Sequence, residues 1–200
     1  YFLDLTIKTE IPIVVIGAMK NSSEPDWDGP KNLIDALHIC LNENSKNLGV
    51  LVCLNGEINA ASEVTKIYSD SVESFKSLDF GTLGFVQKGR VIFNRLPRHL
   101  ETIKTEKINT NVDLLTVYAG MNEKFFKFSA DSGVDAIVVE ALGVGNVLPP
   151  AFEGIKFVYG NCVYYCVIFS DYLNGQKARI KLMIVLGLTN KQSEIRKYFE

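Results

Sequence analysis

The chain has 200 residues, of which 47% are hydrophobic and 22% are charged, and its formal net charge is -2. This length allows one large globular domain or two small ones, and the small negative charge provides no basic field for nucleic acid. The longest apolar runs, 11–19 and 182–188, fall short of the roughly 20 residues that a membrane-spanning helix needs. We therefore expect neither a nucleic-acid partner nor a membrane span.

The first half of the chain alternates between strand and helix patterns. Residues 11–17 form a β-branched apolar run, and residues 49–54 form a continuous apolar run. We expect both to be strands of one sheet that are buried on both faces. Residues 84–94 predict a hairpin that turns at 87–90 and adds an antiparallel edge to the sheet. Between the first two strands, Pro30 opens a helix whose apolar side is predicted to contain Leu33, Leu37, Cys40 and Leu41.

The second half begins after a charged segment, 96–111, whose lack of apolar periodicity predicts a linker. The expected elements beyond it are strands 112–118, 136–140 and 162–169, helices 123–132, 151–158 and 175–186, and a short final helix capped by Ser193. Alternating strands and helices indicate mainly parallel sheets that are covered by helices. The sequence thus predicts an α/β fold with two lobes, 1–95 and 112–200.

The four cysteines, Cys40, Cys53, Cys162 and Cys166, show neither metal-binding nor redox-motif spacing. Free cysteine in apolar segments behaves as a small hydrophobe. Cys162 and Cys166 lie four residues apart on one predicted strand, too far along it to form an undistorted disulfide. We therefore predict a reduced, cytoplasmic protein without a metal site or a cofactor.

Two short motifs each allow a second interpretation. The segment Gly143-Val144-Gly145-Asn146 superficially resembles a phosphate-binding turn, but it lacks the third glycine and any Gly-Lys-Ser end. Asp28, two residues before Pro30, could open a calcium loop, but an EF-hand needs more oxygen ligands and a glutamate at its twelfth position. Helix capping by Asp28 is the simpler interpretation.

Lys66 is the first candidate for chemistry, because the segment 60–66 follows the apolar run 49–54. Loops at the carboxyl ends of parallel strands are the usual place for an active site in α/β proteins. A partly desolvated lysine near an aspartate can activate a hydroxyl nucleophile. The alternative is a solvated surface lysine, since perturbed lysines are uncommon.

Six segments, taken in chain order, carry a family resemblance. They are Tyr1-Phe2-Leu3-Asp4-Leu5-Thr6, Ile16-Gly17-Ala18-Met19-Lys20, Asp28-Gly29-Pro30, Val64-Thr65-Lys66, Phe80-Gly81-Thr82-Leu83-Gly84 and Asn174-Gly175-Gln176-Lys177-Ala178-Arg179. In this order they resemble the bacterial-type L-asparaginase family along nearly the whole chain. The resemblance implies the two-lobed asparaginase fold, self-association into dimers or tetramers, and conversion of asparagine to aspartate and ammonia by a threonine nucleophile.

The resemblance also implies roles for three residues. Lys66 matches a catalytic cation that acts on the threonine hydroxyl, Ala18 borders the substrate pocket, and Asn146 helps to line the pocket of an adjacent subunit. The family's Thr-Gly-Gly-Thr and Gly-Thr-Asp-Thr motifs do not occur in these residues, and a strand and glycine-rich loop are missing after helix 151–158. We therefore expect an incomplete chain that is inactive alone. The alternative is a non-catalytic scaffold or assembly protein derived from an asparaginase.

Overall fold

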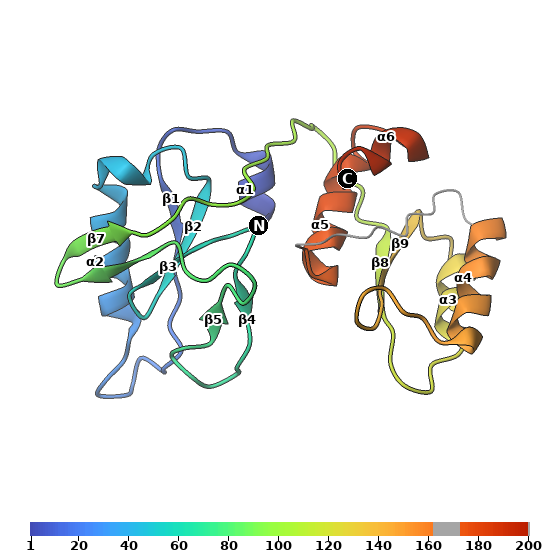
Figure 1. The fold of residues 1–200 in the computed structure, drawn as a ribbon, viewed down its shortest axis with the longest axis horizontal. Helices are drawn as coiled ribbons and strands as arrows, with labels where there is room; N and C mark the ends of the chain where they lie inside the picture. The colour runs from blue at the N-terminus through green and yellow to red at the C-terminus, as the bar shows by residue number, and fades with distance from the viewer. Residues whose placement is uncertain (162–172, 200) are drawn as a thin grey trace. The chain divides into compact units, whose positions relative to one another are not determined.

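The computed structural model describes residues 1–161 and 173–199. The predicted strand 162–169, with Cys162 and Cys166, lies outside these residues. The chain divides into two compact units, Tyr1–Thr102 and Ile103–Glu200 (Figure 1). The boundary falls within the segment 96–111, whose assignment as a linker stays a prediction. In the part of the chain that is described, no helix is long and apolar enough to cross a membrane.

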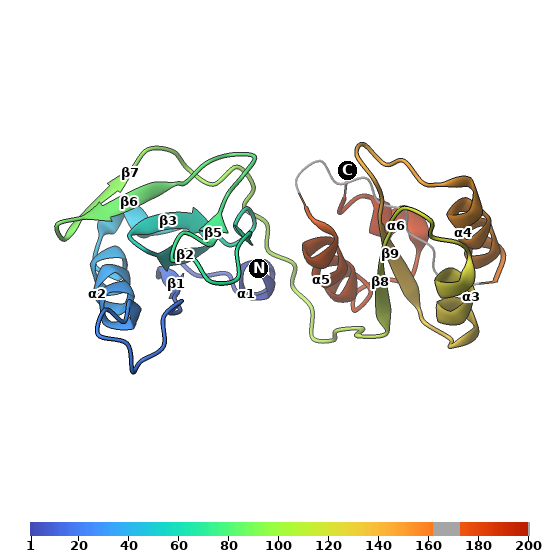
Figure 2. The same cartoon turned by 90° about the horizontal axis from the view of Figure 1, so that it is seen from below.

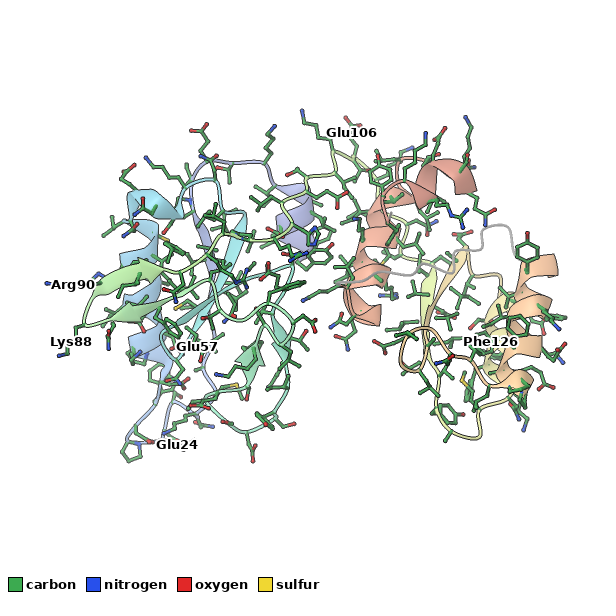
Figure 3. The ribbon with its side chains drawn as sticks, in the orientation of Figure 1. Glu24, Glu57, Lys88, Arg90, Glu106 and Phe126 are labelled. Carbon is green, nitrogen blue, oxygen red and sulfur yellow. The ribbon has the colours of Figure 1, made fainter. Side chains whose placement is uncertain are left out.

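The first unit contains a five-stranded sheet whose strand order is β1-β2-β3-β6-β7, and a separate two-stranded sheet, β4-β5. Its strands are β1 (Ile13–Val15), β2 (Val50–Leu54), β3 (Glu57–Ala60), β4 (Thr65–Lys66), β5 (Phe75–Lys76), β6 (Gly84–Gln87) and β7 (Arg90–Phe93). Its helices are α1 (Phe2–Thr6), α2 (Gly29–Cys40) and the short 3-10 helix η1 (Glu43–Ser45). The α/β fold and the edge hairpin, β6-β7, are confirmed. Lys88 and Arg90 mark the tip of this hairpin (Figure 3).

A second hairpin, β2-β3, was not predicted. Asn55 and Gly56 both have positive φ angles, 51° and 77°, as a two-residue type I′ turn requires. Strand β3 therefore returns antiparallel along β2, so that Ala60 pairs with Leu51. Of the pairings in this sheet, β1 with β2 is the parallel one. The expectation that Lys66 directly follows the carboxyl end of β2 is wrong, because β3 intervenes.

Strand β2 is buried on both faces, as predicted. Leu51 and Cys53 contact the core on the side of α2, which includes Ile39. On the opposite face, Val50, Val52 and Leu54 form a cluster with Ala61 and Val64, which we call the Val64 cluster. Alternate side chains of a strand point to opposite faces, which explains the division. Figure 2 shows α2 below one face of this sheet.

Strand β1 is shorter and less buried than the apolar run 11–17 suggests. It lies at the edge of the sheet, and Val15 and Ile11 are exposed. The expectation of a strand buried on both faces is therefore wrong for β1, because its outer edge has no neighbouring strand within the described unit. Apolar composition alone does not distinguish an edge strand from a central one.

Helix α2 faces the sheet with a side that the sequence analysis did not select. Its buried residues are Asn32, Asp35, Ala36 and Ile39. Its predicted apolar side faces solvent, since Leu33, Leu37 and Leu41 are more than half exposed and Cys40 is exposed with a free thiol. The physical reason is that the Asn32 side chain has polar partners outside the helix and Asp35 pairs with Lys31 one turn earlier, so that burial leaves both satisfied.

Helix α1 is attached to β2 by one carboxylate. Asp4 is buried, and its Oδ1 accepts a hydrogen bond of 2.7 Å from the Val50 N–H. Gly49, the residue before it, has a φ of 70°, and a Cβ atom at that position would lie 2.4 Å from Asp4 Oδ1. A glycine is therefore required at position 49 both by the left-handed backbone and by the approach of Asp4.

The second unit is built on two parallel strands, β8 (Val112–Thr116) and β9 (Ala136–Glu140). Helix α5 (Gly175–Val185) covers one face, and α3 (Lys124–Asp131) and α4 (Pro149–Asn161) cover the other (Figures 1 and 2). Phe126 of α3 is fully buried at the α4 interface (Figure 3), where a Cβ on Gly154 would approach its side chain to 2.7 Å. The last helix, α6 (Gln192–Arg196), has Lys191 at its N-cap. The prediction that Ser193 caps this helix is therefore wrong.

Candidate functional site

Lys66 lies in β4, opposite Phe75 of β5. Its Nζ atom is 5.9 Å from the centroid of the Phe75 ring, within the distance of a cation-π contact. The residue is exposed. Within the described residues of the first unit, Lys66 is therefore held by strand pairing and by contact of its ammonium with the Phe75 ring, and the residue stays accessible to solvent.

Ala18 lies just after β1 and is also exposed. The Ala18 segment and the β4-β5 sheet that contains Lys66 contact the same hydrophobic surface, because Met19 and Phe75 both pack against the Val64 cluster. The structure thus brings these two predicted site segments to one face of the five-stranded sheet. This arrangement depends on the β2-β3 hairpin, which directs the chain back across the sheet before β4 begins.

A buried ion pair supports the segment that leads into β4. The Glu63 side chain is only 1% exposed. Its carboxylate accepts hydrogen bonds from Nη1 and Nη2 of Arg95 and, at 2.8 Å, from the backbone N–H of Arg98. Arg95 also donates to the carbonyl of Gly81. These residues were missed by the sequence analysis, because nothing in the spacing of single charges indicates a partner so distant in the chain.

A second ion pair connects β5 to the main sheet. Lys76 of β5 pairs with Glu57 of β3, which Figure 3 labels, and both side chains are partly buried. Beyond β4, the Ile67 N–H donates to the Ser74 carbonyl at 2.7 Å. The short sheet that contains Lys66 is therefore joined to β3 through Lys76, and the Ile67–Ser74 bond holds its own two strands together.

Asp28 occupies the N-cap position of α2, but its side chain makes no capping hydrogen bond to the helix. Instead, its carboxylate accepts the N–H of Met19 at 3.1 Å and the N–H of Lys20 at 3.0 Å. Partial burial acts to raise the pKa of Asp28, but these bonds and one from Asn32 outweigh it and hold the pKa below its ordinary value. The predicted cap position of Asp28 is confirmed, but its carboxylate binds two amides of the preceding turn instead of the helix N–H groups.

Asn146 lies in the second unit, in the tight loop 142–146. Its N–H donates to the Leu142 carbonyl at 2.8 Å, and its carbonyl accepts the Leu142 N–H at 3.0 Å. Gly143 and Gly145 adopt positive φ angles of 54° and 104°, which few other residues tolerate. Asn146 is exposed. Ala18 and Lys66 belong to the first unit, so the three predicted residues are divided between the two units.

A pocket of about 450 Å³ is found in the second unit, near α6. It is lined by Leu188, Thr189, Glu194, Lys197 and Tyr198. Two of its polar side chains bind each other, since Thr189 Oγ1 donates to Glu194 at 2.5 Å. None of the three predicted site residues lines this pocket. Within the described residues, no cluster of His, Cys, Asp or Glu has the arrangement of a metal site.

The fold consists of two α/β units, and comparison with known proteins shows which family it belongs to. Residues 1–99 match the family profile described as Asparaginase, N-terminal. The chain is 32% identical over its full length to a probable periplasmic L-asparaginase of Haemophilus influenzae and to L-asparaginase 2 of Escherichia coli. It spans 65% of the length of each of these relatives.

A solved structure agrees with these relatives. The crystal structure of a probable cytoplasmic L-asparaginase from Campylobacter jejuni superposes with a TM-score of 0.89 at 32% sequence identity. It covers 99% of this chain, and this chain covers 74% of it. The chain belongs to the bacterial-type L-asparaginase family.

Proposed function

We propose that the protein acts as an L-asparaginase-type amidohydrolase, which converts asparagine to aspartate and ammonia. The observation that carries this proposal is the relation of the whole chain to proteins named as L-asparaginases. In such a reaction a threonine hydroxyl attacks the side-chain amide, and backbone N–H groups hold the oxyanion. Ammonia then leaves, and water releases aspartate from the acyl-enzyme.

In this proposal Lys66 supplies the positive charge that promotes loss of the proton from the threonine hydroxyl. Its position on β4, with its Nζ atom 5.9 Å from the centroid of the Phe75 ring, supports the role. The turn at Ala18 lies on the same face of the sheet and would border the substrate. Because Lys66 is exposed in the described unit, the desolvation that its role needs would come from substrate and from an apposed subunit.

We further propose that copies of the chain associate as dimers or tetramers, and that the Asn146 loop of one copy lines the substrate pocket of another. The exposure of Asn146 and the two backbone bonds that stiffen its loop support this role. Light scattering should report a mass above that of one chain. A strict monomer at every accessible concentration would contradict the assembly.

A cytoplasmic location is part of the same proposal. It is supported by the free thiols of Cys40 and Cys53, which suit a reducing compartment. Among the relatives, the Campylobacter jejuni protein is named as cytoplasmic and the Haemophilus influenzae protein as periplasmic. Cell fractionation decides between these compartments.

Ammonia release from asparagine and from glutamine tests the activity. The protein to be assayed includes whatever its reading frame encodes upstream of Tyr1, because residues 1–200 do not contain the paired threonine motifs. Lys66→Ala should lower kcat by orders of magnitude, whereas Asn146→Ala should mainly raise KM. Lys88→Ala, at the tip of the β6-β7 hairpin (Figure 3), is the control and should change neither. Full activity in Lys66→Ala would overturn the proposed role.

The alternative function is a non-catalytic scaffold or assembly protein. It is favoured by the solvent exposure of Lys66. The two functions predict different upstream sequences. A Gly-Thr-Asp-Thr segment followed by ammonia release identifies the enzyme, and an upstream sequence without that segment, together with no ammonia release, identifies the scaffold.

A further inference from the structure

Asn32 is a completely buried polar residue on the inner side of α2. A buried amide group destabilises the fold unless it is hydrogen-bonded. The hydrogen bonds that the Asn32 side chain makes go to residues before or outside the helix, and none goes to the helix itself. Its Nδ2 donates to the Gly17 carbonyl at 2.9 Å and to Asp28 Oδ2 at 3.1 Å. Its Oδ1 accepts the Asn55 N–H at 3.0 Å. One side chain thus connects the end of β1, the start of α2 and the β2-β3 turn.

Asp28 extends this connection to the turn formed by residues 17–20, which we call the Ala18 turn. Held by Asn32, the Asp28 carboxylate accepts the N–H groups of Met19 and Lys20. The two peptide groups on either side of Ala18 are therefore both fixed from the inside. Asn32 holds the first through the Gly17 carbonyl, and Asp28 holds the second through the Met19 N–H.

Peptide geometry then determines where the polar groups of Ala18 point. In a trans peptide the carbonyl and the N–H point in opposite directions, and the described chain contains no cis peptide bond. Since the Gly17 carbonyl points toward Asn32, the Ala18 N–H in the same peptide points away from it. Since the Met19 N–H points toward Asp28, the Ala18 carbonyl points away likewise. Both groups of this exposed residue are directed outward.

We propose that Asn32 and Asp28 are positioning residues that clamp the Ala18 turn, so that the Ala18 N–H and carbonyl are presented in fixed directions to the substrate. This inference rests on the proposed function, in which Ala18 borders the substrate pocket. An alanine provides only its backbone for polar recognition, so its usefulness depends on the groups that hold that backbone. Pre-organised backbone groups bind without reorganisation at the moment of reaction.

Two substitutions separate the parts of the clamp. Asn32→Asp keeps the oxygen that accepts the Asn55 N–H but loses both Nδ2 donors and places a second carboxylate beside Asp28. Asn32→Ala removes all three bonds. The matched control is Asn59→Ala. Asn59 is also buried in the first unit and accepts a hydrogen bond of 2.8 Å from Ser77, but this bond does not involve the Ala18 turn.

Amide hydrogen exchange measured by NMR reads out the clamp without any need for activity. In Asn32→Asp, and in Asn32→Ala where it folds, the protection of the Met19 and Lys20 amides should fall about tenfold or more relative to that of Val52 in the central strand β2. Asn59→Ala should leave this ratio unchanged. Parallel loss of protection at all three amides in the Asn32 variants would reduce Asn32 to a general stabilising role and overturn the proposal.

Kinetics supply the second readout. A misplaced Ala18 turn weakens contacts that are made in ground state and transition state alike, so Asn32→Asp should raise KM about tenfold while kcat changes much less. An active wild type whose KM is unchanged in Asn32→Asp would overturn the positioning role. If the wild-type protein releases no ammonia, the proposed function fails, whereas the exchange ratio still supports or overturns the clamp.

Discussion

Glu63 and Arg95 form a two-pronged ion pair between residues 32 apart in the chain, in which the carboxylate is buried and the guanidinium is partly exposed. The pair fixes the segment before β4 to the segment after β7, and Arg98 adds its backbone N–H to the same carboxylate. The position of Lys66 therefore depends on a contact made three residues before it.

Removing either partner should destabilise the first unit unequally. Arg95→Met leaves a buried carboxylate without its cation and should lower the free energy of unfolding by about 3 kcal/mol, whereas Glu63→Gln should cost less because Arg95 can reach solvent. Urea unfolding followed by the fluorescence of Trp27, the one tryptophan of the chain, reports on this unit. Lys46→Gln removes the exposed pair with Glu43 and is the control, with no expected change in midpoint. Equal effects of Arg95→Met and Lys46→Gln would contradict this account.

The Asp28 carboxylate should make stability depend on pH in acid. Its pKa in the folded protein is lowered, so its contribution is complete above the unfolded-state pKa of about 3.9 and is lost as the pH falls through the lower folded value. The difference in unfolding free energy between wild type and Asp28→Asn should therefore be largest above about pH 4 and should shrink below it. Urea titrations of both proteins between pH 6 and pH 2.5, roughly the range of that shift, measure the difference. A difference that grows in acid would show that the sign is wrong.

The two described thiols should react at very different rates. Burial, with a smaller contribution from the charge of Asp35, raises the pKa of the Cys53 thiol to about 12, and the thiolate is the reactive form. Cys40 is exposed on α2. In a background with Cys162→Ser and Cys166→Ser, a thiol reagent should label Cys40 rapidly and Cys53 only as the unit unfolds. Adding Cys40→Ser should abolish the fast phase, and fast labelling that survives this change would place Cys53 at the surface.

Truncation of a side chain should destabilise the protein strongly on the buried side of α2 and hardly at all on its exposed side. Ile39→Ala removes a fully buried side chain and should lower the unfolding free energy by about 3 kcal/mol. Leu37→Ala removes an exposed one and should change it by less than about 0.5 kcal/mol. Unfolding monitored at Trp27 compares the two. A larger loss in Leu37→Ala would indicate that this side of the helix is covered in solution.

The order of elements was largely predictable because long apolar runs and strong turn signals are local. Strand β2, the β6-β7 hairpin and the helices of the second unit follow from periodicity and from glycine and proline positions. The β2-β3 hairpin was also predictable, because Asn55-Gly56 between two apolar runs is a strong hairpin signal. Because the Asn55-Gly56 turn leads the chain into β3, Lys66 follows β3 instead of following β2 directly.

The inner face of α2 could not be predicted from hydrophobicity. Periodicity selects the side with Leu33, Leu37 and Leu41, whereas the side that packs contains Asn32 and Asp35. The burial of Asn32 depends on partners contributed by Gly17 and Asn55, which only the folded chain brings near. For the same reason the clamp on the Ala18 turn and the support of Lys66 by Glu63 were not visible in the sequence.

The contact between Asp4 and Gly49 makes two distant positions of the gene mutually dependent. Any side chain at position 49 would collide with the carboxylate that accepts the Val50 N–H, so a lineage could replace Gly49 only after Asp4 had shortened or changed rotamer. Loss of Asp4 would in turn leave a β2 amide without its acceptor. A substitution of Gly49 should therefore be found only in sequences that have also changed Asp4, and a library that varies position 49 alone should recover mainly glycine.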